Sequence, residues 1–433
     1  MEKTQETVTI SLKMQDKYLH IIEKVNYYLF IFAICLLPFQ TRFSLLAWEI
    51  WLVSWLLEGR FMRKENIQWH KGIMPIVLLT IWILWEGISY FWAINQSDAI
   101  NTLVRHLSFI AILPIAIWGV NSQYNWEKAI KWFIASCVLS VFIYINYIYI
   151  VQQWNYLQSH HKLPEYVSSW SYFGDVISMY KHRLYYGTIL NLGIAALLQI
   201  RVSLFSKTSY PKVVTTLFFV SLFTLVAGIV LSGSRANMLT LIAISVLSII
   251  QPLRGKTKVL GTALVVVAGI AIGGLLITQH PRFEKLQWDH IAERAAYETY
   301  EVEPRINIWY SALQTPTDYI IHGVGVGGNA EYLKPIYSEF KWKSFYDRQY
   351  NAHNQYLGVL INLGIFGAIF FLLIWLLYPY WYKGKTKQIA TLVAVIIGLN
   401  MLTENMLERI DGVIITCCSI LLIALLSRAQ LAK

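Results

Sequence analysis

The sequence predicts an all-α integral membrane protein, and two observations indicate it. Of its 433 residues, 56% are hydrophobic and only 14% are charged, which does not suit a soluble multi-domain protein. Apolar segments of about 20 residues, each able to cross roughly 30 Å of hydrocarbon, recur along the chain. These segments are continuously apolar and do not alternate with polar residues, which favours membrane helices over a β-barrel.

Twelve candidate spans centre near residues 32, 50, 83, 112, 140, 192, 222, 244, 268, 366, 396 and 421. The first span, stopped by Pro38, and the short second span suggest a tight hairpin. We predict a cytoplasmic segment at 1–24, spans one to nine in 25–278, a large helical loop in 279–352, and spans ten to twelve with a short cytoplasmic tail in 353–433.

The distribution of Lys and Arg predicts the orientation. With a cytoplasmic N-terminus, the inside segments hold 21 of these residues and the opposite short loops hold 7. Cytoplasmic loops carry this excess in membrane proteins, so both termini are predicted to be cytoplasmic and the 279–352 loop to face the other side. The net charge of +11 is then mainly a topology signal, and no nucleic-acid partner is expected. All four cysteines fall in apolar segments, so neither a disulfide framework nor a zinc site is expected.

The large loop holds two motifs. In "WDHIAERAAYETYEVEPRINIWYSALQ", we predict a helix that is interrupted at Pro304 and a second helix that starts at Arg305, because proline is favoured in the first helical turn. The glycine-rich segment "HGVGVGGNAEYL" lacks the preceding strand of a dinucleotide-binding site and is interpreted as a turn between two helices.

Two arginines on the non-cytoplasmic side are candidate anion-binding residues. Arg235, in "VLSGSRANML", lies where the charge bias disfavours arginine, at the start of a span whose backbone N–H groups can bind an anion. Arg305 occupies the first turn after Pro304. The alternatives are a membrane-interface arginine for Arg235 and a salt bridge from Arg305 to Glu301 or Glu303. Together the two arginines suit the phosphates of a lipid-linked substrate.

His353 opens the tenth span in "NAHNQYLGVLINLGIFG" and is the candidate general base, because a neutral imidazole accepts protons near neutral pH. The alternative is a histidine that contacts lipid headgroups. His160, His161 and His182 lack partners at metal-ligand spacing and are interpreted as surface residues. No metal and no cofactor are expected.

These residues form a pattern that resembles the signature of bacterial O-antigen ligases. His353 and Asn354 are followed after nine residues by Gly364 and then, after two more, by Gly367. The "SGSRANML", "PRINIW" and "GVGVGG" segments are similar to that family too. The resemblance covers residues 212–420 well, and before residue 200 it depends on the span layout alone.

The resemblance implies a multi-pass glycosyltransferase of the bacterial inner membrane with its active site facing the periplasm. It implies metal-independent transfer of a glycan from undecaprenyl diphosphate to a sugar hydroxyl of the lipid A core. Arg235 and Arg305 match the arginines that hold the donor diphosphate, and His353 matches the histidine at the acceptor hydroxyl. Asn354 is assigned to substrate binding, and Glu404, in "LTENMLERI", to orienting His353 or Arg305.

Three alternatives stay open. A polysaccharide polymerase would use the same donor and another lipid-linked glycan as acceptor, and a protein O-glycosyl ligase would use a protein. A secondary transporter would place ionisable residues near mid-membrane in two related halves, whereas these candidates crowd one surface.

Overall fold

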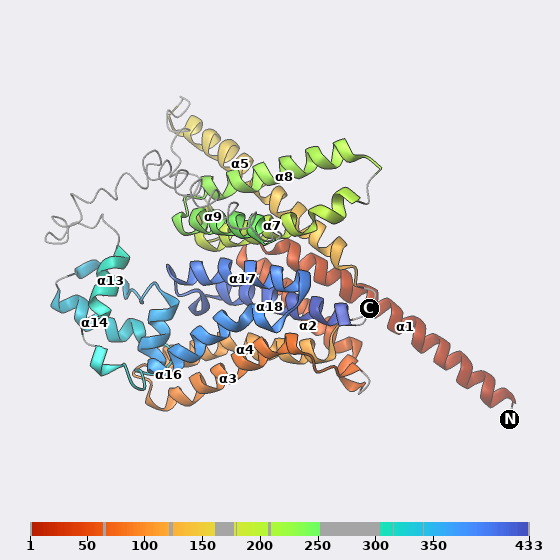
Figure 1. Cartoon of the computed structure of the whole chain (residues 1–433), viewed down its shortest axis with the longest axis horizontal. Coiled ribbons are helices and arrows are strands. Elements are labelled where there is room, and N and C mark those ends of the chain that lie inside the picture. Colours follow the sequence, from red (N-terminus) through yellow and green to blue (C-terminus); the bar gives the residue numbers. More distant parts are fainter. Residues whose placement is uncertain are drawn as a thin grey trace.

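The computed structural model describes residues 2–63, 66–120, 124–160, 177–178, 180–206, 209–251, 304–314, 316–340 and 342–431. Within these ranges the chain is helical and contains no strand, as the sequence predicts. Figure 1 shows long helices packed side by side, with a group of short helices at one end.

Among the described residues, eleven helices lie at the positions of predicted spans: α1 (Glu2–Leu36), α2 (Thr41–Glu58), α3 (Met74–Ser89), α4 (Gln96–Trp118), α5 (Trp126–His160), α7 (Arg183–Ser206), α8 (Pro211–Leu231), α9 (Arg235–Ile250), α16 (Gln355–Leu377), α17 (Gly384–Met401) and α18 (Ile410–Leu431). The candidate near residue 268 lies outside the described residues. The predicted hairpin is observed, since α1 packs along α2.

Six of the described helical segments are long and apolar enough to cross a membrane, and α9 is a shorter apolar helix. Their outward faces are also apolar. Phe223 on α8 and Phe366 on α16 are 74% and 71% exposed, which suits side chains that face lipid and not water. The structure therefore supports a membrane protein, and the number of twelve spans stays a prediction.

The bundle is built around α18. In its apolar stretch 72% of the residues are buried, against 22% in α8. Helix α18 packs against α2, α3, α4, α7 and α17, so helices from both ends of the sequence meet on it. Residues 402–409 form the turn that connects α17 to this central helix.

A second, smaller core lies at that end. It contains α13 (Pro304–Ala312), α14 (Asn329–Glu339) and α15 (Lys343–Arg348), and its buried residues include Ile308, Leu333 and Tyr337. Helix α13 begins at Pro304, one residue before the predicted start at Arg305, and the glycine-rich segment is a turn leading into α14, as predicted. The helix predicted before Pro304 lies outside the described residues. Ile361 of α16 belongs to this core, which fixes the short helices to the bundle.

Gly364 explains part of the glycine pattern in the tenth predicted span. Helix α16 is kinked there, with φ 68° and ψ −172°. A Cβ atom at this position would lie 2.2 Å from the carbonyl oxygen of Ile321, directly before the glycine-rich segment. Only glycine combines this positive φ with so close a backbone approach. The kink lets Ile365 N donate to Ile320 O at 2.7 Å, which joins the turn to the helix.

Candidate functional site

His353 lies directly before α16 in a backbone conformation that is uncommon for a residue with a side chain. Its φ is 43°, and its N–H donates to Oδ1 of Asn351 at 3.1 Å. The imidazole packs edge-on against Tyr350, with 5.4 Å between ring centroids. Non-glycine residues in this left-handed region cluster at functional sites, because the surroundings must hold them there.

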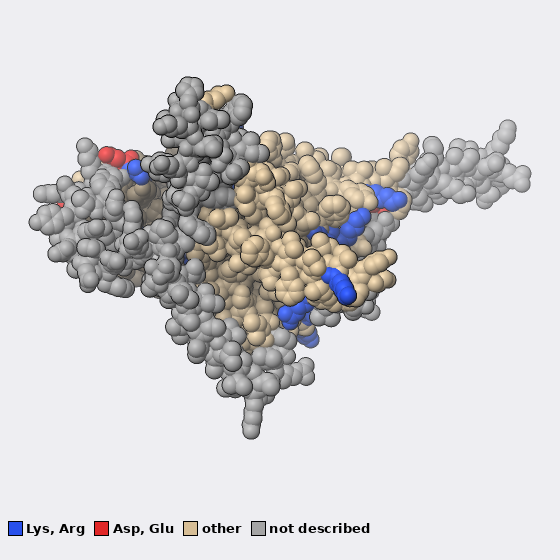
Figure 2. Space-filling model, turned by 90° about the horizontal axis from the view of Figure 1, so that it is seen from above, with Lys and Arg blue, Asp and Glu red and all other residues tan. Residues whose placement is uncertain are grey.

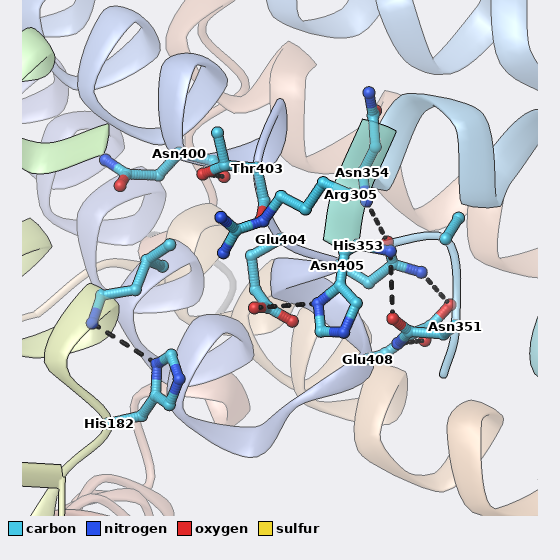
Figure 3. A network of polar contacts seen from close by, with 12 residues as sticks. His182, Arg305, Asn351, His353, Asn354, Asn400, Thr403, Glu404, Asn405 and Glu408 are labelled. Atoms are coloured by element: carbon cyan, nitrogen blue, oxygen red, sulfur yellow. Dashed lines mark hydrogen bonds and ion pairs between the residues drawn. The ribbon is translucent and has the colours of Figure 1, made fainter. Parts of the chain in front are cut away.

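The imidazole of His353 faces a buried carboxylate. Its Nδ1 lies 3.3 Å from Oε2 of Glu404, and the two side chains are 25% and 3% exposed. Figure 3 shows the two side chains pointing toward one another. An ionised carboxylate only accepts hydrogen bonds, so this contact places the proton on Nδ1 and leaves Nε2 with the lone pair. Within the described residues, Nε2 has no hydrogen-bond partner.

The charge of Glu404 is favoured by its neighbours. Burial by itself would raise its pKa, but the hydrogen bond from His353 and the electrostatic interactions with His353, His182 and Arg305, which act as Glu404 titrates at acidic pH, outweigh burial. The net effect is a lowered pKa, so Glu404 is a carboxylate at neutral pH.

Arg305 reaches the same place from α13. Its Nε donates to the carbonyl oxygen of Thr403 at 2.9 Å, and its charge acts on Glu404. The predicted site residues from three distant segments, Arg305, His353 and Glu404, are thus brought together. In Figure 3, Arg305 lies on one side of the His353–Glu404 pair, and Asn351 and Glu408 lie on the other.

Arg235 is the first residue of α9. Asn237, in the same turn, donates from Nδ2 to Leu184 O at 2.8 Å and to Ser234 Oγ at 2.9 Å. Leu184 lies two residues after His182, and the imidazole of His182 interacts electrostatically with Glu404. The start of α9 therefore lies at the same end of the bundle as His353, Arg305 and Glu404.

Asn354 has the contacts of a helix cap. Its Oδ1 accepts hydrogen bonds from the N–H groups of Tyr356 and Leu357 at 3.0 and 3.2 Å, which satisfies the first turn of α16. Its own N–H donates to Oδ1 of Asn405 at 2.7 Å. These contacts give Asn354 a structural task, and its assignment to substrate binding stays a prediction.

Glu408 is a part of the site that sequence reasoning missed. Its Oε1 accepts from Nδ2 of Asn329 at 2.6 Å and of Asn405 at 2.8 Å, and its Oε2 accepts from Nδ2 of Asn351 at 2.6 Å. Burial raises the pKa of Glu408, although the three amides act in the opposite direction. Through these hydrogen bonds the Glu408 carboxylate connects three segments: α14, the segment before His353 and the turn before α18.

His182 corrects the sequence interpretation, because it is not a surface residue. It is half-buried beside Glu404, and burial is the main cause that lowers its pKa to about 4. Its imidazole is neutral at pH 7, and its Nδ1 accepts a hydrogen bond from the N–H of Leu184 at 3.4 Å. No local pattern distinguished His182 from the neighbouring histidines.

Two side chains of α4 form hydrogen bonds with backbone carbonyl groups of the turn at residues 402–409. His106 lies within hydrogen-bond distance of the Leu407 carbonyl oxygen, with Nε2 at 2.9 Å, and its Nδ1 lies 2.6 Å from Oε2 of Glu86 on α3. Arg105 donates to the carbonyl oxygen of Glu408. Buried backbone carbonyls need such partners, so α4 determines the path of the turn that carries Glu404 and Glu408.

A polar cleft of about 340 Å³ opens beside His353. Its lining includes His353, Glu404 and Glu408 together with Asp98, Arg105 and Arg409. Its volume lies within the ordinary range of small-molecule sites. The described residues contain no cluster of His, Cys, Asp or Glu suited to a metal ion. A histidine with a free ring nitrogen, oriented by a carboxylate in a polar cleft, can accept a proton from a hydroxyl group.

No curated protein matches the chain significantly. Residues 220–372 match the model of a protein family described as O-antigen ligase, and this segment contains Arg235, Arg305, His353 and Asn354. The match covers about a third of the chain and shows that this part of it is similar to the O-antigen ligase family.

Proposed function

We propose that this protein transfers a glycan from undecaprenyl diphosphate to a sugar hydroxyl of the lipid A core. The observation that carries the proposal is the His353–Glu404 pair, which opens into a polar cleft at the end of the bundle with Arg305 beside it. The match to the O-antigen ligase family supports a ligase or polymerase, and the donor, the acceptor and the orientation belong to the proposal.

In the proposed reaction, the acceptor hydroxyl gives its proton to Nε2 of His353. The hydroxyl oxygen bonds to the anomeric carbon of the donor sugar, and the bond from that carbon to the diphosphate oxygen breaks. Glu404, 3.3 Å from Nδ1, stabilises the imidazolium that forms. The proton then leaves to water.

The diphosphate departs with the bonding electron pair, and Arg305 and Arg235 stabilise its charge. Guanidinium groups bind phosphate oxygens in a bidentate manner, and fixed positive charge at a leaving group lowers the barrier. We propose that this arrangement makes the reaction metal-independent. The prenyl tail of the donor stays in the lipid beside the apolar helix faces.

We propose that the site faces the periplasm of a bacterial inner membrane. Both termini lie at the end of the bundle opposite α13 and α14 (Figure 1). Over the face seen in Figure 2, Lys and Arg gather toward that same end. Both observations support cytoplasmic termini, a periplasmic 279–352 loop and a periplasmic site.

Labelling tests this orientation. Ser338 is exposed on α14, so a Ser338→Cys variant is expected to react with an impermeant maleimide in intact spheroplasts. The native cysteines give a low background, because three of them are buried and Cys35 is half-buried. Labelling that requires permeabilised membranes would contradict the proposed orientation.

An assay with purified protein tests the function. The protein is incubated with an undecaprenyl-diphosphate-linked glycan and either lipid A core or a second lipid-linked glycan, with and without EDTA. We expect the glycan on lipid A core and no effect of EDTA. Product only on the second lipid-linked glycan would establish a polymerase instead, and loss of activity with EDTA would refute metal independence.

A further inference from the structure

The cleft beside His353 contains two arginines that the proposed donor site does not use. Arg105 comes from α4 and Arg409 from the turn before α18. Arg409 is exposed, and its guanidinium forms no hydrogen bond or ion pair with the described residues. Arg105 makes one bond, to the carbonyl oxygen of Glu408, and it too lacks an ion pair in the described part of the chain.

The carboxylates that line the cleft form no ion pair with these arginines among the described residues. Glu404 is engaged by His353, and Glu408 accepts from three asparagine amides. Asp98 contacts the Asn95 amide at 2.9 Å, in the cap of α4. Two guanidinium groups therefore face one polar cleft without a carboxylate partner, which is the arrangement that recognises an external anion.

The position of the cleft identifies which substrate enters it. Arg305 does not line the cleft, and it lies across the His353–Glu404 pair from Asn351 and Glu408, which do (Figure 3). In a displacement at the anomeric carbon, the attacking oxygen approaches from the side opposite to the leaving oxygen. If Arg305 holds the leaving diphosphate, the cleft is on the side of the attacking hydroxyl.

We propose that this cleft is the acceptor subsite, and that Arg409, supported by Arg105, binds an anionic substituent on the acceptor sugar. The proposal rests on the proposed function. Phosphate and carboxylate substituents share the required chemistry. The asparagine amides and Asp98 provide hydrogen-bond partners for sugar hydroxyls.

The test measures transfer by the full-length protein at saturating donor while the acceptor concentration varies. Arg409→Gln is expected to raise the acceptor KM about fivefold to tenfold, the loss of one charge-assisted hydrogen bond at an exposed site. The donor KM and the maximal rate should change by less than about twofold. Arg409→Lys should recover part of the acceptor affinity, because the charge remains.

The matched control is Arg42→Gln. Arg42 is an exposed arginine at the start of α2, next to Thr41, which donates to Asp411 at the same end of the bundle. It does not line the cleft, so its acceptor KM should match that of the wild type. An equal increase in this control would reduce the Arg409 effect to general surface charge and overturn the proposal.

Competitors distinguish the two anionic substituents. Glucose 6-phosphate and glucuronate are compared with glucose as inhibitors of transfer to lipid A core. Inhibition by either anion, competitive with the acceptor and weakened in Arg409→Gln, supports the proposal and names the substituent. Equal inhibition by all three sugars, or a raised donor KM in Arg409→Gln, overturns it. Absence of transfer by the wild type would instead refute the proposed function.

Discussion

Two histidine–glutamate pairs in this protein have the same chemistry and different surroundings. His353 Nδ1 lies 3.3 Å from Glu404, with side chains 25% and 3% exposed. His106 Nδ1 lies 2.6 Å from Glu86, with side chains 2% and 4% exposed. The second nitrogen of His106 contacts the Leu407 carbonyl oxygen, whereas that of His353 has no partner among the described residues. A pair suited to chemistry differs from a structural one by a free nitrogen and an open cleft.

The two pairs are also connected. Leu407, which His106 contacts, lies three residues beyond Glu404 in the same turn. The buried pair fixes that turn against α3 and α4, and the turn presents Glu404 to His353. Substitutions in the two pairs should therefore separate into losses of activity and losses of stability.

The largest expected effect on activity is at His353. His353→Ala should lower the transfer rate about a hundredfold to ten-thousandfold, the typical contribution of general base catalysis. Donor binding, measured with labelled lipid-linked glycan, should stay close to that of the wild type. Wild-type activity in this variant would exclude general base catalysis by His353 and favour the alternative, in which the histidine contacts lipid headgroups.

The backbone at His353 requires a second variant. Alanine is disfavoured at φ 43°, so His353→Ala can disturb the turn as well as remove the base. Asparagine tolerates this conformation, and His353→Asn should be as inactive while unfolding at the same temperature as the wild type. His353→Gln keeps a hydrogen bond without basicity, and activity retained there would assign His353 to positioning the acceptor.

The buried pair should show the opposite behaviour. Glu86→Ala leaves His106 without its partner, and breaking a buried pair in this way costs about 3–5 kcal/mol of unfolding free energy. Thermal unfolding in detergent measures the loss, and activity per folded molecule should fall far less than in His353→Asn. A double variant, Glu86→Leu with His106→Leu, should regain stability. Unchanged unfolding in Glu86→Ala would contradict a structural role.

The sequence was sufficient for features that local patterns encode. The apolar segments predicted the long helices, Pro304 predicted the start of α13, and the glycine-rich segment predicted a turn. The site network was not accessible in this way. Glu408 meets Asn329 and Asn351 across 79 and 57 residues, and His106 meets Leu407 across 301. Helical periodicity carries no information about such long-range partners, and Glu408 also lacked a motif of its own.

A smaller loss of activity is expected for Arg305 and Arg235, the two arginines proposed to bind the donor diphosphate. Arg305→Lys and Arg235→Lys should each lower the transfer rate about tenfold to a hundredfold, because a lysine cannot replace two parallel hydrogen bonds to phosphate. Lys334→Arg, on α14 outside the cleft, is the control for altered charge geometry. Full activity in both lysine variants would exclude bidentate binding of the diphosphate.

The smallest expected effect separates the two carboxylates of the turn by their pH dependence. The pKa of Glu404 is lowered from 4.5, so its ionised form stabilises the fold above that pH, and this stabilisation is lost as the pH falls through the lowered pKa. The pKa of Glu408 is raised from 4.5, so its ionised form costs stability at neutral pH, and the cost disappears as the pH falls through the raised pKa.

Unfolding temperatures of Glu404→Gln and Glu408→Gln, each relative to the wild type, should therefore change in different windows, below pH 4.5 for Glu404 and above it for Glu408. Titrating groups remote from the two carboxylates are common to the three proteins and cancel in these differences. A Glu404 difference that stays constant through the acidic window would mean that His353, His182 and Arg305 do not hold Glu404 ionised, and the assignment of the proton to Nδ1 of His353 would lose its basis.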